Sequence, residues 1–128
     1  MTSEFVASAY MAAAAARAAL RALGGIKVSL RICGGSDEAG AVGLGLRAPL
    51  MESVELAPVL VRSGADGVEQ IVVDALTIES ATGAFGEELQ RVLRASRIQW
   101  NGSERRISAV RSDHLGGAAY LYRLSLEA

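Results

Sequence analysis

Residues 97–126, RIQWNGSERRISAVRSDHLGGAAYLYRLSL, predict an antiparallel β-meander. The dipeptide Asn101-Gly102 is the strongest short signal for a two-residue hairpin turn, and it separates a strand at 97–100 from a strand at 104–111. A second turn at 113–117 leads to a last strand in which large apolar side chains alternate with smaller or polar ones. The large side chains that share one face of this last strand are Tyr120, Tyr122, Leu124 and Leu126.

A predicted hairpin and a short helix precede the meander. Strands at 54–62 and 68–79 flank a turn at 63–67, and the second strand is apolar on both faces in its middle. Pro58 indicates an edge position or a bulge in the first strand, because proline cannot donate a ladder hydrogen bond. Residues 85–95 predict a helix with acidic residues early and arginines late, which suits the helix dipole. Its apolar residues at helical spacing are Phe85, Leu89, Val92 and Leu93.

The first predicted elements are an alanine-rich helix over residues 3–23 and a strand over 26–33. Thr2 or Ser3 caps the helix, and the pair Gly24-Gly25 ends it. A stripe of mostly small residues at spacings of three and four would let a partner approach this helix closely. The residues of the stripe are Phe5, Ala9, Ala12, Ala16, Leu20 and Leu23.

The alternatives for this helix are a secretory signal and a membrane span, and the sequence argues against both. No Lys or Arg precedes the apolar stretch, whereas Glu4 does, and Arg17 interrupts it. The uncharged stretch 5–16 is too short to cross a bilayer. We therefore expect neither a signal peptide nor a transmembrane segment, and a cytoplasmic location.

Together these elements predict a single domain over residues 1–128 with an α+β fold. The β-rich body at 54–128 predicts a small, mostly antiparallel β-barrel or sandwich of about six strands, with the N-terminal helix and the short helix before the meander packed on it. Residues 34–46, which lie between the first predicted strand and the β-rich body, carry five of the 14 glycines. They predict a long loop, with a short strand near 42–46. The net charge of −1 gives no global basic field that would draw the chain to nucleic acid or anionic lipid.

No catalytic, metal-binding or cofactor-binding constellation is predicted. The single histidine, His114, falls in the predicted turn at 113–117, and the single cysteine, Cys33, lacks a histidine partner. The glycines at 40, 43 and 45 spell G-x-x-G-x-G, which is not the dinucleotide-binding fingerprint, and no predicted helix follows them. We expect no cofactor, no metal and no enzymatic activity.

One local cluster of positive charge remains. Six arginines lie within 21 residues and form a candidate basic surface. Strand alternation places Trp100 on the face opposite Arg97, where it is expected in the core, so nucleic-acid binding ranks below a solvated or subunit-facing role. The six residues are Arg91, Arg94, Arg97, Arg105, Arg106 and Arg111.

The second half of the chain resembles the small head–tail joining proteins of tailed bacteriophages and prophages, which include connector, head-closure and tail-attachment proteins. The resemblance rests on the predicted hairpin, the short helix, Ile98–Gly102, Arg106–Val110, the glycine turn Leu115–Gly117 and the alternating last strand, within residues 54–128. It implies a non-enzymatic component of the virion that forms a homo-oligomeric ring between portal and tail. It also implies cytoplasmic assembly, portal, adaptor or tail partners, and nucleic acid only as DNA in the ring lumen.

The candidate subunit interface combines the small-residue stripe with the predicted loop. A ring needs a heterologous interface, in which one patch meets a different patch on the neighbour. The alternative function is a small bacterial ligand-binding or protein-interaction domain, with a concave apolar site near Trp100, Tyr120 and Tyr122. The candidate interface residues are Phe5, Ala9, Ala12, Ala16, Leu20, Asp37, Glu38, Val42 and Leu44.

Overall fold

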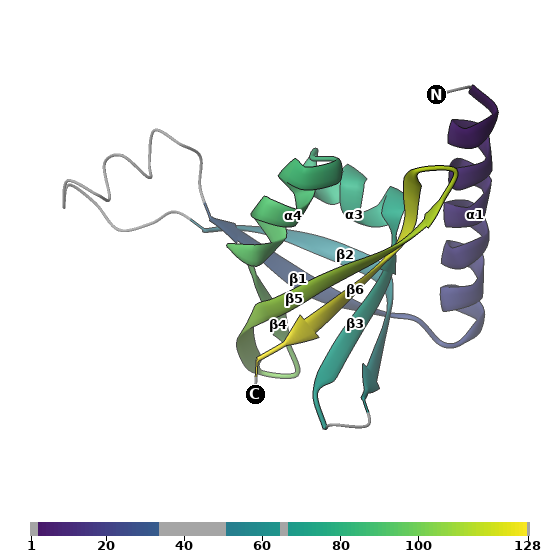
Figure 1. Cartoon of the computed structure of the whole chain (residues 1–128). Helices are drawn as coiled ribbons and strands as arrows, with labels where there is room; N and C mark the ends of the chain where they lie inside the picture. Colours follow the sequence, from purple (N-terminus) through teal and green to yellow (C-terminus); the bar gives the residue numbers. More distant parts are fainter. Residues whose placement is uncertain (1–2, 34–50, 65–66, 128) are drawn as a thin grey trace, which may run out of the picture.

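The computed structural model describes residues 3–33, 51–64 and 67–127, and its main element is a closed six-stranded barrel (Figure 1). The strand order around the barrel is β1-β2-β3-β6-β5-β4, and every neighbouring pair is antiparallel. The predicted α+β fold is confirmed, as a barrel and not a sandwich. The strands are β1 (Ile26–Cys33), β2 (Met51–Ser63), β3 (Glu69–Asp74), β4 (Arg97–Trp100), β5 (Ser103–Leu115) and β6 (Ala118–Leu126). The helices are α1 (Ser3–Ala22), α3 (Ala75–Thr82) and α4 (Gly86–Arg94).

The interior of the barrel is a single apolar cluster built by strand alternation. Val28 and Leu30 of β1 point inward, whereas the residues between and beside them are more exposed. In β6 the predicted large face is confirmed, since Tyr122, Leu124 and Leu126 are buried. Burying an aliphatic or aromatic side chain contributes about 1.5–3 kcal/mol, so this cluster stabilises the barrel.

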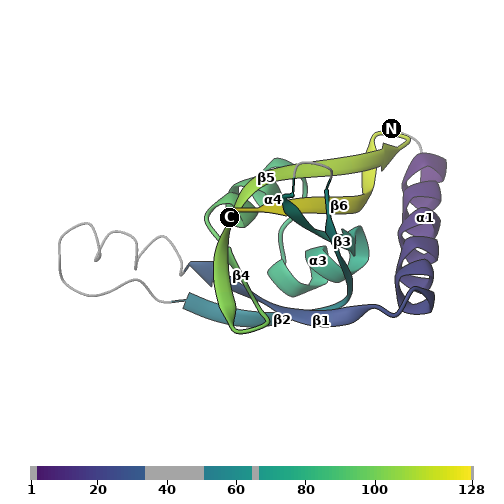
Figure 2. The same cartoon turned by 90° about the horizontal axis from the view of Figure 1, so that it is seen from below.

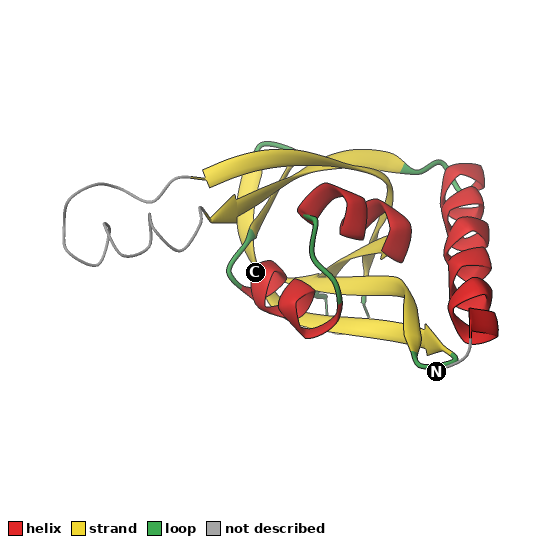
Figure 3. Cartoon of the chain, turned by 90° about the horizontal axis from the view of Figure 1, so that it is seen from above, coloured by secondary structure: helices red, strands yellow, loops and turns green. Residues whose placement is uncertain are grey.

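Two short helices lie across one end of the barrel (Figure 3). They occupy the connection from β3 to β4, and their buried side chains, Ile78 of α3 with Leu89 and Leu93 of α4, join the barrel cluster. Phe85, which helical spacing groups with Leu89, instead precedes α4 and is exposed. The helices therefore close this end of the barrel and place Phe85 at its outer surface.

The strand predicted over 68–79 is wrong in its second half, because β3 ends at Asp74 and α3 begins at Ala75. The Thr77 backbone N–H donates to Asp74 Oδ2 at 2.9 Å, and the Thr77 hydroxyl donates to Asp74 Oδ1 at 2.7 Å. Asp74 is thus the N-cap of α3, which satisfies one of the free amide groups of the first turn. The cap turns an apolar run that resembles a buried strand into a helix.

Pro58 lies at a bulge in β2, which confirms one of the two predicted alternatives. Ile26 pairs with Val59 and Val28 pairs with Leu56, so two residues of β2, Ala57 and Pro58, face one residue of β1. β2 pairs on both sides within the closed barrel, so the edge alternative does not apply. The bulge lets the proline sit inside a paired strand without a lost ladder bond.

The second turn of the meander is shorter than predicted. β5 continues to Leu115, and Gly116 and Gly117 alone connect it to β6, both with positive φ (63° and 84°). Glycine adopts this conformation without steric cost, and two such residues form the tight hairpin turn that matches strand twist. His114 therefore belongs to the β5–β6 ladder, opposite Ala119, and not to a turn.

Helix α1 stands beside the barrel and contacts β6, β2, β3 and α3 (Figures 1 and 2). Its buried side chains are small or aliphatic: Ala9, Ala13 and Leu20. Small residues let the helix lie close to the hairpin of β5 and β6, where larger ones would hold it away. The predicted alanine-rich helix is confirmed, and it ends one residue earlier than predicted, at Ala22.

Candidate functional site

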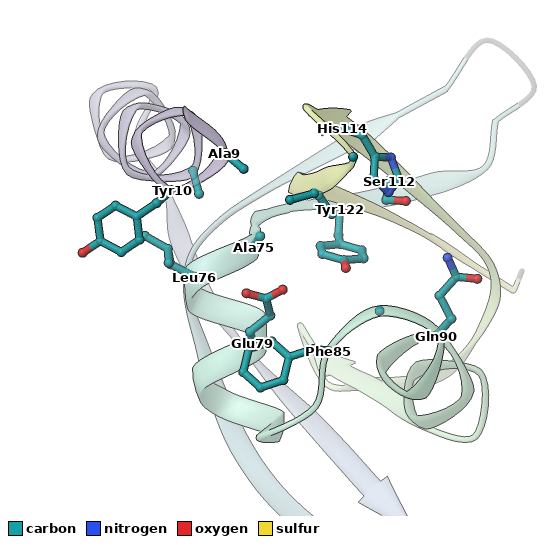
Figure 4. A pocket seen from close by; sticks show the side chains of 15 residues that line it. Ala9, Tyr10, Ala75, Leu76, Glu79, Phe85, Gln90, Ser112, His114 and Tyr122 are labelled. Carbon is teal, nitrogen blue, oxygen red and sulfur yellow. The ribbon is translucent and has the colours of Figure 1, made fainter. Parts of the chain in front are cut away.

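A hollow lies where α1, α3 and the β5–β6 hairpin meet the start of α4 (Figure 4). Its volume is about 390 Å³, within the range of about 300–1,000 Å³ that is typical of ligand pockets. We call it the cap cavity, because it lies beside the helices that close the barrel. The lining residues are Ala9, Tyr10, Ala13, Ala75, Leu76, Glu79, Phe85, Gly86, Gln90, Ser112, His114, Gly117, Ala118, Ala119 and Tyr122.

Two exposed aromatic side chains line the cap cavity. Tyr10 of α1 is 61% exposed and Phe85 is 66% exposed, and both line the cavity. Leu115, also exposed, stands in the chain between the lining residue His114 and the hairpin turn. Monomeric proteins rarely gather large apolar side chains on their surface without an interaction that covers them.

Two polar groups point into the cap cavity from opposite walls (Figure 4). The Glu79 carboxylate comes from α3 and the Tyr122 hydroxyl from β6. Tyr122 is 2% exposed, yet its hydroxyl has no hydrogen-bond partner among residues 3–33, 51–64 and 67–127. Within the same residues no Lys or Arg forms an ion pair with Glu79. Both groups are therefore available to a ligand.

Burial in the cavity wall raises the pKa of the Glu79 carboxyl above its ordinary value of 4.5, and the negative charge of Asp74 raises it further. Burial also raises the pKa of the Tyr122 hydroxyl, with a second contribution from the charge of Glu79. Desolvation and like charge both disfavour the ionised form of a carboxyl group. A cation bound nearby would therefore stabilise the ionised form of Glu79.

The raised pKa of the Glu79 carboxyl predicts that this group lowers the free energy of unfolding as the pH rises. Because the folded chain binds a proton at Glu79 more tightly than the unfolded chain does, the free energy of unfolding falls as the pH rises through and above 4.5. We expect Glu79→Gln to remove this fall, so that the variant is more stable than the unsubstituted chain at neutral pH and equal to it at acidic pH. Urea unfolding at a series of pH values measures the difference.

The control for this measurement is Glu88→Gln, which changes an exposed carboxylate of α4. It should leave the pH dependence of the free energy of unfolding as it is in the unsubstituted chain. A Glu79→Gln variant that is no more stable than the unsubstituted chain at neutral pH would contradict the prediction.

The predicted small-residue stripe faces the chain's own barrel over much of its length. Ala9 and Leu20 are buried there, and Ala12 and Ala16 are half-buried. Leu23, the last member of the stripe, is 67% exposed. The chain itself therefore covers part of the surface that the sequence assigns to a neighbour, and subunit contact at this stripe stays a prediction. Of the other candidate interface residues, Asp37, Glu38, Val42 and Leu44 lie outside the described residues, and so does the side chain of Phe5.

The six arginines of the candidate basic surface are spread over α4, β4 and β5, and two of them are neutralised by acidic side chains. Arg97 lies 3.4 Å from Glu104, and Arg105 lies 2.8 Å from Glu69. The four exposed ones without an ion pair in the described chain are Arg91, Arg94, Arg106 and Arg111. These four are the basic groups that remain available to a partner.

The concave site expected near Trp100, Tyr120 and Tyr122 is wrong in two of its three residues. Tyr122 lines the cap cavity, whereas Trp100 lines a different hollow together with Gly24 and Ile26. Tyr120 is half-buried and lines neither. Trp100 packs against the barrel cluster as a half-buried residue, so its expected place in the core is confirmed only in part.

Sequence reasoning missed Tyr10, Glu79 and Phe85 as residues of one site. Glu79 is predicted on a strand, and only the helix that begins after Asp74 turns it toward α1 and β6. Tyr10 carries a sequence signal, since a lone aromatic residue among alanines is conspicuous, but nothing in the sequence indicates its neighbours. The site depends on segments that are far apart in the chain.

The described residues contain no group of three or more His, Cys, Asp and Glu side chains placed to hold a metal ion. None of the described helices combines the length and the apolar character that a membrane crossing requires. Comparisons with protein-family models, with curated proteins and with solved structures found no match for the chain.

Proposed function

We propose that the chain is a non-enzymatic assembly protein whose subunits join one another at the cap cavity. The observation that carries this proposal is the pair of exposed aromatic side chains, Tyr10 and Phe85, that line one cavity. Burial of these side chains against a neighbour would remove their apolar surface from water, which is the main favourable term in protein association. The compact barrel supplies a rigid body for such an assembly.

The proposal extends to a ring between head and tail of a tailed phage. The resemblance of residues 54–128 to head–tail joining proteins supports this context, and a closed barrel with a laterally packed helix is compatible with it. The arginines on the outside of α4 and β5 offer a second patch of different chemistry from the cavity mouth. Two different patches on one subunit are what a heterologous, ring-forming interface requires.

The first test is the molar mass in solution, measured by light scattering after size exclusion over a range of protein concentrations. We expect the unsubstituted chain to form a defined oligomer. Phe85→Gln should weaken association by at least about thirtyfold, the effect of removing a central apolar contact of about 2 kcal/mol. The comparison variant is Leu23→Gln, which removes a similarly exposed apolar side chain just after α1 and tests whether the subunits join at the small-residue stripe instead.

Each outcome bears on the proposal. An oligomer that weakens with Phe85→Gln and not with Leu23→Gln supports docking at the cap cavity. Equal weakening by both variants would point to unspecific association of apolar surface. A monomer at every concentration would contradict self-assembly and favour the second candidate function, a ligand-binding domain. The Tyr122 hydroxyl and the Glu79 carboxylate in the cap cavity support this second candidate.

A further inference from the structure

The cap cavity is suited to a positively charged group. Glu79 is the only charged side chain among the described residues that line it, with His114 counted as neutral, and no Lys or Arg is among them. Its carboxylate is partly withdrawn from water and faces the charge of Asp74 as well. A cation bound beside Glu79 would offset both effects, whereas an anion would add a third like charge.

Four polar side chains of the cavity each offer an oxygen atom that can accept a hydrogen bond, in addition to the ring of His114. The Glu79 carboxylate, the Gln90 amide oxygen and the hydroxyls of Ser112 and Tyr122 lie around the same space (Figure 4). A guanidinium group carries five N–H donors in a planar fork and no acceptor, so it matches this set better than a neutral polar group does. The aromatic rings of Tyr10 and Phe85 at the mouth and Tyr122 inside add faces on which a guanidinium stacks.

We propose that the cap cavity of one copy of the chain receives the side chain of Arg106 from a neighbouring copy. This inference rests on the proposed self-assembly and names the residue that enters the cavity. It defines a heterologous contact, because the cavity and Arg106 are different surfaces of the same subunit.

Two exposed arginines lie directly opposite another arginine that already has a carboxylate partner: Arg111 opposite Arg123, and Arg106 opposite Arg97. Arg111 adjoins the lining residue Ser112, whereas a heterologous contact needs a second patch away from the cavity, so Arg106 is the candidate. Like charges directly opposite on a sheet destabilise it. Arg106 is exposed and has no ion pair within the described residues. A carboxylate from a neighbour would therefore relieve this repulsion.

The chain cannot satisfy Arg106 with its own Glu79. Arg106 and the cavity residue Ser112 are six positions apart on β5, which is about 20 Å along a strand at about 3.4 Å per residue. An arginine side chain does not extend so far. The pairing therefore joins two subunits and repeats from each subunit to the next.

The test uses two variants that each remove one side of the contact, Glu79→Gln and Arg106→Gln. Each alone should weaken association by at least about thirtyfold, since truncating one partner of a buried charge pair costs about 2–5 kcal/mol. Mixed together, they should form a 1:1 dimer that grows no further. In that dimer the intact cavity of the Arg106→Gln chain receives the intact arginine of the Glu79→Gln chain. Light scattering after size exclusion distinguishes the monomer, the dimer and the full oligomer.

Two further variants make the result decisive. Arg62→Gln, which removes another exposed arginine, on β2, should leave assembly unchanged. The charge swap Glu79→Arg with Arg106→Glu in one chain should restore part of the association that either single change removes.

The outcomes separate this inference from the function on which it rests. If the unsubstituted chain assembles while Glu79→Gln and Arg106→Gln assemble equally well, the pairing is wrong and self-assembly stands. If Arg62→Gln weakens assembly and Arg106→Gln does not, the named arginine is wrong. If the unsubstituted chain stays monomeric at every concentration, self-assembly itself fails.

Discussion

Replacing Gly25 with alanine is expected to lower the free energy of unfolding by about 3 kcal/mol, the upper part of the range for overpacking. A Cβ atom at this position would lie 2.7 Å from the Pro58 Cβ and 2.8 Å from the Leu20 carbonyl oxygen. The Leu20 carbonyl already accepts the Gly25 backbone N–H at 2.8 Å, which fixes the end of α1. Neither obstacle is the flexible end of a side chain, so the helix has to shift away from β2.

Urea unfolding followed by far-ultraviolet circular dichroism and by Trp100 fluorescence measures this loss. Trp100 is the single tryptophan and lines the same hollow as Gly24, so its emission reports on the junction between α1 and the barrel. For a chain of this size, about 3 kcal/mol corresponds to a decrease in Tm of roughly 10 °C. The loss should appear in both signals, because the junction and the barrel share one apolar cluster.

Gly24→Ala is the matched control for this prediction. Gly24 has a φ of 84°, and a Cβ atom added there would have no atom of the described chain within 4 Å. Alanine at this position therefore meets only the conformational cost of a left-handed residue, about 1 kcal/mol. If the two variants lost the same stability, backbone conformation and not the contact with Pro58 would be the cause. The comparison isolates the close approach of α1 to the bulge in β2.

The β-strands could be predicted from the sequence because each encodes its own alternation. Tyr122, Leu124 and Leu126 alternate with partly exposed residues in β6, and the two-residue turn at Asn101-Gly102 connects β4 to β5. Turn chemistry and side-chain period are local properties, so they need no knowledge of the neighbours. The number of strands and the end of α1 follow from the same local signals.

The helix α3 could not be predicted in this way, because its sequence fits a buried strand equally well. The run from Val72 to Ile78 is mostly apolar, and periodicity alone does not separate a short buried helix from a strand. What decides is the capping geometry at Asp74 and the open end of the barrel, which accepts Ile78. That second condition exists only once the barrel has closed.

The cap cavity depends on distant segments to an even greater degree. It joins residues of α1, α3, β5 and β6, and the sequence contains no pattern that relates Tyr10 to Tyr122. The stripe predicted as a subunit interface is covered in part by the barrel of the same chain, at Ala9 and Leu20. A stripe that permits close approach indicates that something packs there, and it does not indicate whether the partner is the same chain.

Replacing Asp74 with alanine is expected to lower the free energy of unfolding by about 2–3 kcal/mol, from the loss of the helix cap and of a second hydrogen bond. The carboxylate is fully buried and accepts from both the backbone N–H and the hydroxyl of Thr77. Arg17 Nε of α1 also lies 3.5 Å from Asp74 Oδ2, so the substitution removes the charge that this cation faces. Urea unfolding measures the loss.

Asp74→Asn separates the cap from the charge. Asparagine caps a helix about as well as aspartate, so this variant should keep most of the stability that Asp74→Ala loses, and retain only the cost of the missing attraction to Arg17. It also removes the negative charge that raises the pKa of the Glu79 carboxyl, so the fall in stability above pH 4.5 should become smaller. If Asp74→Asn destabilised the chain as much as Asp74→Ala, the charge facing Arg17 and not the cap would hold α3 in place. In that case the orientation of Glu79 toward the cap cavity would depend on α1, since the helix that presents it would be held from that side.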